Sequence, residues 1–143
     1  MDDGVSDRGS MTLETAILGP ALIAMFVVMI AAGRIAIAAG SIDAAARDAA
    51  RQASIARGPN AAHRAALSSA RQALVREGLK CSPSVTVSTG GFSRSVGTSA
   101  NVSATVVCDV ALADIALPGM PGSKTLRSTF VSPLDPYRGR DDS

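Results

Sequence analysis

The sequence predicts an α+β protein. A long N-terminal hydrophobic helix is followed by a second, amphipathic helix and a small antiparallel sheet of about three strands. A long uncharged run lies near the N-terminus, an alanine-rich stretch without proline follows it, and the apolar residues after Cys81 recur with a period of two. Apolar residues make up 47% of the chain but aromatic residues only 3%, so we expect a core of small side chains.

The uncharged run covers residues 15–33, TAILGPALIAMFVVMIAAG. As a helix it would be roughly 28 Å long, which is close to the thickness of the hydrocarbon core of a bilayer. Because the alanine-rich sequence continues it, we expect one helix from about Met11 to Ala56. Residues 10–33 are its membrane part, and residues 34–57 its amphipathic continuation. Pro20, preceded by Gly19, is expected to kink this helix or open it locally.

A second helix is predicted over AAHRAALSSARQALVRE, residues 61–77, with Asn60 as its N-cap and Gly78 as its end. Its apolar stripe consists of Ala66, Leu67, Ala70, Ala73 and Leu74. Because this stripe is small, the helix needs tertiary contacts to be stable.

Strands are predicted in the second half of the chain. Residues 81–87 and 102–112 alternate apolar and polar side chains, and the Gly/Ser-rich residues 88–101 connect them. TLRSTFVS, residues 125–132, is expected to form a third strand. We interpret residues 58–137 as an exported α+β domain. The polar residues from Pro133 onward are expected to fray, and residues 138–143 to form a disordered tail.

The two cysteines, Cys81 and Cys108, lie in phase with the valines of the predicted strands. In an exported domain such a pair favours a disulfide, which would close a loop of about 28 residues and contribute about 3–4 kcal/mol in the chain-entropy model. The alternative is two buried free thiols in a cytoplasmic domain. The shared strand phase favours the disulfide.

Composition and motifs argue against catalysis. With one histidine and two cysteines the chain cannot assemble a zinc site or a Cys–His nucleophile, and it contains no P-loop, GxGxxG or GxSxG motif. The net charge is +2 and the basic residues are dispersed, which does not indicate nucleic-acid binding. We therefore expect no enzyme activity, no metal, no cofactor and no small-molecule substrate.

The N-terminal stretch DRGSMTLETAILGP, residues 7–20, resembles the processing site of type IV prepilins and pseudopilins. The longer run LETAILGPALIAMFVVMIAAGRIAIAAGSIDAAARDAARQAS resembles the head of TadE-like proteins, which are minor pilins of the tight-adherence (Flp, type IVc) pilus system. ALADIALPGMPGSKTL resembles their C-terminal region more weakly. Together these resemblances cover most of residues 8–137.

The resemblance implies that a prepilin peptidase cuts between Gly9 and Ser10 and removes a leader of residues 1–9. Glu14 would then be the fifth residue of the mature chain, where its carboxylate neutralises the N-terminal amine of a neighbouring subunit and sets the axial register. Pro20 lies where pilin helices commonly carry a proline. The implied partners are the inner membrane, crossed once with the C-terminal domain outside, the peptidase and other pilins. The implied destination is an adhesive pilus at the cell surface.

Two features depart from this pattern and leave alternatives open. The leader carries Asp2, Asp3 and Asp7 against one basic residue, Arg8, while arginines follow the apolar run, which opposes the orientation with the C-terminus outside. The AIA sequence at residues 36–38 is similar to a signal-peptidase site. The chain could therefore be a secreted domain, or an uncleaved membrane anchor with Glu14 in the interface. In either case it would be a binding or adhesin domain that does not polymerise.

Overall fold

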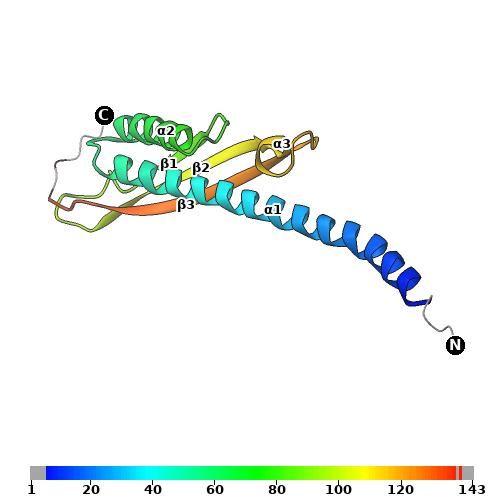
Figure 1. Ribbon diagram of the computed structural model, residues 1–143. Helices are drawn as coiled ribbons and strands as arrows, with labels where there is room; N and C mark the ends of the chain where they lie inside the picture. Colours follow the sequence, from blue (N-terminus) through cyan, green and yellow to red (C-terminus); the bar gives the residue numbers. More distant parts are fainter. Residues whose placement is uncertain (1–5, 138, 140–143) are drawn as a thin grey trace.

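The computed structural model describes residues 6–137 and 139, with side chains from Glu14 onward. Its elements are α1 (Ser6–Ser54), α2 (Pro59–Arg76), β1 (Ser84–Ser88), β2 (Ala100–Ala111), α3 (Leu112–Ile115) and β3 (Ser123–Leu134). Figure 1 shows that α2 and the C-terminal half of α1 lie against the sheet, whereas the N-terminal half of α1 projects away from the rest of the chain. The α+β class and the two predicted helices are confirmed.

Helix α1 is longer at its N-terminus than the sequence predicted. It begins at Ser6 rather than near Met11, and it ends at Ser54. Adding a turn to an existing helix costs far less than nucleating a new one, which explains why the polar residues before the apolar run continue it. The helix also runs through Pro20 without interruption. Figure 1 shows this part of α1 as gently curved.

Helix α2 begins two residues earlier than predicted. Its N-cap is Gly58, in an extended conformation, and Pro59 occupies the first helical position, so Asn60 lies inside the first turn. Proline is favoured at the first helical position because its fixed φ suits the helix. It lacks a backbone N–H, but an N–H at this position has no partner within the helix. The helix ends at Arg76 with Glu77 as its C-cap, and Gly78 stops it as predicted. With φ at 71°, Gly78 donates to the carbonyl of Val75, and Leu79 donates to the carbonyl of Leu74, which is the Schellman arrangement.

The three strands form an antiparallel sheet in the order β1-β2-β3. The register pairs Val85 of β1 with Val106 of β2, and Cys108 of β2 with Leu126 of β3. Along β2 the even-numbered side chains face the helices and are buried, as their period of two predicted. The opposite face is polar, and there the hydroxyls of Thr105 and Thr129 are hydrogen-bonded at 2.8 Å across neighbouring strands.

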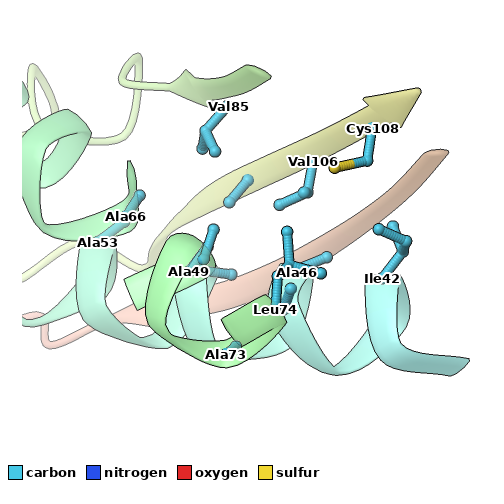
Figure 2. Packing of buried hydrophobic residues seen from close by; sticks show 14 of the residues in the cluster. Ile42, Ala46, Ala49, Ala53, Ala66, Ala73, Leu74, Val85, Val106 and Cys108 are labelled. Atoms are coloured by element: carbon cyan, nitrogen blue, oxygen red, sulfur yellow. The ribbon is translucent and has the colours of Figure 1, made fainter. Parts of the chain in front are cut away.

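The core is thin because alanine forms most of its helical side. The alanines of α1 and α2 that face the sheet are almost fully inaccessible to solvent, and larger side chains such as Ile42, Leu74 and Val106 fill the space between them (Figure 2). The buried alanines are Ala38, Ala45, Ala46, Ala49, Ala50 and Ala53 of α1 and Ala62, Ala66, Ala70 and Ala73 of α2. Small side chains at helical spacing let the two helices approach each other and the sheet closely.

The connection between β1 and β2 contributes a core residue that the sequence did not predict. Phe92 is 2% exposed and is the largest of the fully buried side chains. Next to it, Gly91 lies so close to β2 that a Cβ there would overlap the carbonyl oxygen of Asn101 and lie 2.8 Å from Cδ1 of Leu134. The loop is therefore packed against the end of the sheet.

The C-terminal segment is more ordered than predicted as far as Tyr137. Pro133 and Leu134 belong to β3, Leu134 is buried, and the carbonyl of Pro136 accepts a hydrogen bond of 2.7 Å from the backbone N–H of Gly97. Proline is tolerated because β3 is an edge strand. The tail predicted at residues 138–143 lies outside the described residues, except for Gly139.

Candidate functional site

The most conspicuous functional surface is the free part of α1. In its most apolar 18-residue window the mean hydropathy is 2.4, and none of that window is buried inside the protein. Large apolar side chains are exposed on every side of the helix there, between 49% and 68% for all but one of them. These residues are Ile17, Leu18, Leu22, Ile23, Met25, Phe26, Val27, Val28, Met29 and Ile30. A helix that is apolar all round and in contact with nothing is typical of a membrane or filament segment.

The residues predicted for processing and assembly lie at the start of this helix. Gly9 and Ser10 are within α1, and their side chains lie outside the described residues. Glu14 is exposed and stands immediately before the apolar run. Pro20, also exposed, lies in the same helix and has no N–H to donate to the carbonyl of Ala16. The carboxylate of Glu14 is therefore accessible at the edge of the apolar run.

The predicted disulfide between Cys81 and Cys108 is present, with their Cα atoms 6.0 Å apart. Cys108 is 1% exposed in the middle strand, and Cys81 is half-buried in the connection between α2 and β1. The bond therefore fastens the end of the helical layer to the centre of the sheet. Cys81 and Pro83 precede β1, so they do not belong to that strand as the alternation had suggested.

A polar groove of about 590 Å³ separates the exposed sides of α1 and α2. Across it, a guanidinium nitrogen of Arg76 donates to a carboxylate oxygen of Asp48 at 3.0 Å. Both side chains are well exposed, so this pair contributes at most about 1 kcal/mol. Sequence reasoning did not find it, because the partners are 28 positions apart.

Other polar side chains of the helices are structural. His63 is exposed on α2, and its Nε2 donates to the carbonyl of Val85 at 3.1 Å, which links α2 to β1. Arg47 lies over the ring of Phe130, 5.6 Å from its centroid. Within the described residues, no three His, Cys, Asp or Glu side chains are grouped to hold a metal ion.

The comparison with protein families agrees with the position of this surface. A family model described as TadE-like protein matches residues 9–51, from Gly9 through Glu14 and the whole apolar segment into the buried half of α1. The match does not reach the C-terminal region, where the sequence resemblance was weaker. Comparisons with curated proteins and with solved structures found no match. Residues 9–51 of the chain are therefore similar to TadE-like proteins.

Proposed function

We propose that this chain is a minor pilin, or pseudopilin, that assembles into a tight-adherence pilus and acts through assembly and adherence rather than catalysis. The observation that carries the proposal is the free half of α1. Its apolar side chains are exposed around the whole helix, and none of the residues that the structure describes covers them. A bilayer covers this surface before assembly, and the helices of neighbouring subunits cover it afterwards.

In this proposal a prepilin peptidase cuts between Gly9 and Ser10 and creates a new N-terminal amine. When the helix leaves the bilayer, that amine becomes a cation in an apolar filament core, and burying it alone costs several kcal/mol. Glu14 of a neighbouring subunit provides the opposite charge. Since the pair forms at one axial offset between subunits, Glu14 favours one register over the others.

We further propose that the domain after residue 33 faces the outside of the inner membrane. The disulfide supports this orientation, because such bonds persist in oxidising compartments. The arginines that argued against it are spread over two regions. Arg34 flanks the apolar run, whereas Arg47 and Arg51 lie beside the folded domain, Arg47 over an aromatic ring. Because long domains translocate largely regardless of charge, Arg34, next to the apolar run, weighs most against the orientation.

The decisive experiment is mass spectrometry of the mature N-terminus in membrane and sheared-surface fractions of the native host. A chain that begins at Ser10 supports the proposal. A chain that begins at Ala39 supports the secreted binding domain, since the buried helix from Ile42 to Ala53 would survive such a cut. An intact Met1 supports an uncleaved anchor.

Substitution of Glu14 tests the registry role separately. Glu14→Gln keeps the size of the side chain and removes its charge, so incorporation into pili is expected to be lost while membrane insertion is retained. Glu14→Asp is expected to restore part of the incorporation. Asp43→Asn is the matched control, because Asp43 is an exposed carboxylate of the same helix beyond the apolar run. Normal piliation by the Glu14→Gln variant would contradict the proposed role.

A further inference from the structure

A second feature, beyond the assembly helix, lies where α1 leaves the folded domain. A recess of about 170 Å³ is bounded by α1, by the end of α2 and by α3. Its inner part is apolar, with Ile115 3% exposed and Leu79 half-buried. Ile37 of α1 stands beside it and is 72% exposed. The recess is too small for a segment of a second protein. Its volume suits a small polar group, such as part of a lipid headgroup.

Three charged side chains line this recess, one basic and two acidic. They are Arg34 of α1, Glu77 at the C-cap of α2 and Asp114 of α3, and all three are exposed. Among the described residues, the salt bridge within 4.0 Å is Arg76–Asp48, so none of the three is paired with another. The lining of the recess thus includes one cation, which can donate hydrogen bonds, and two anions, which can accept them.

The recess also lies at a defined height relative to the membrane. From Glu14 to Arg34 the helix rises about 30 Å, the thickness of the hydrocarbon core, so Arg34 is at the outer headgroup layer when Glu14 is at the inner one. Figure 1 shows α3 and the turn after it at the end of the sheet on the side toward the projecting half of α1. That turn, ALPGMPG at residues 116–122, carries no charge, and Met120 is 37% exposed within it. This end of the domain therefore suits contact with a bilayer surface.

We propose that the recess binds the headgroup of a phospholipid with a primary ammonium, such as phosphatidylethanolamine. The guanidinium of Arg34 donates to the phosphate, and the carboxylates of Glu77 and Asp114 accept from the ammonium. Phosphatidylglycerol supplies the phosphate without a cation, and phosphatidylcholine supplies a cation without N–H donors. The proposal rests on the membrane insertion inferred above, but it does not depend on assembly into a pilus.

The test uses the full chain, reconstituted into vesicles with equal parts of phosphatidylethanolamine, phosphatidylglycerol and phosphatidylcholine that share the same acyl chains. After mild solubilisation, native mass spectrometry identifies the lipids that remain bound. We expect phosphatidylethanolamine to be enriched roughly twofold to fivefold over the other two, the range for charge-assisted contacts at an exposed site. Protease protection in the same vesicles measures insertion.

Variants assign any enrichment to the recess. Glu77→Gln with Asp114→Asn is expected to abolish the preference for phosphatidylethanolamine, and Arg34→Gln to lower the retention of all three lipids. Asp43→Asn and Arg71→Gln are controls that change exposed charges elsewhere on the helices. If the three lipids remain bound in the same proportions as in the vesicles, the lipid proposal is overturned. It is also overturned if the double variant still enriches phosphatidylethanolamine. Neither result affects the proposed function. A wild-type chain that fails to insert would overturn both proposals.

Discussion

Removing the disulfide between Cys81 and Cys108 is expected to lower the free energy of unfolding of the domain by about 3.5 kcal/mol. The two cysteines are 27 positions apart, and in the chain-entropy model a closed loop of that length removes about 12 cal/mol/K from the entropy of the unfolded chain. This loss weighs heavily because the rest of the core is built mainly from alanine, and each alanine buries little apolar area. In a domain of this size the bond supplies a substantial part of the net stability.

The assay is urea unfolding of the detergent-solubilised full chain, followed by far-ultraviolet circular dichroism because the chain has no tryptophan. With a slope near 1.5 kcal/mol/M, the midpoint of the Cys81→Ala/Cys108→Ala variant should fall by about 2 M. Wild-type protein in a reducing agent should show nearly the same fall, and the variant should not respond to that agent. If the urea midpoint falls by less than 0.5 M both in the variant and in the reduced wild-type protein, the reasoning is refuted. The unfolded chain would then gain little conformational freedom when the bond is absent.

Three packing predictions use the same assay. Ala49→Leu should lower the free energy of unfolding by about 1–3 kcal/mol because it inserts a large side chain between closely packed elements. Its control is Ala44→Leu, on the exposed side of α1, which should change the free energy of unfolding little. Gly91→Ala should also destabilise, through the overlap with β2, while Gly90→Ala should not, since a Cβ at Gly90 has nothing within 4 Å. Phe92→Ala should cost about 3–5 kcal/mol, and a loss below 1 kcal/mol would show that the loop contributes little to the core.

The central strand was predictable because its signal is local and strong. The valines at 102, 106 and 110 alternate with polar residues, and a period of two leaves one face of a strand apolar. The buried stripe of α2 was predictable for the same kind of reason, at helical spacing. The third strand was found but is longer than expected, because its ends are set by pairing with β2 out to Ala100 and Ala111 rather than by its own sequence.

Features that depend on distant contacts were not predictable. Phe92 lies in a Gly/Ser-rich stretch without periodicity, so nothing local indicates that its ring is buried. The sequence shows locally that Glu14 stands at the edge of the apolar run, but it gives no sign of the recess. Arg34, Glu77 and Asp114 belong to three different elements, and only the packing of α2 and α3 against α1 brings them to one cavity.

One continuous helix serves both as the free apolar segment and as the main core element of the domain, and this has a mechanical consequence. Between Gly33 and Ser54 no proline interrupts α1, and burial begins at Ala38, about one turn after the apolar run ends. The domain therefore cannot swing on a loop, because a change in its tilt must bend a continuous helix whose C-terminal half is packed against the sheet. A displacement of Glu14 along a filament axis would be transmitted to the domain as a rigid shift. In the membrane, the same rigidity keeps the recess beside Arg34 at one depth, so the position of the helix in the bilayer decides whether headgroups reach it.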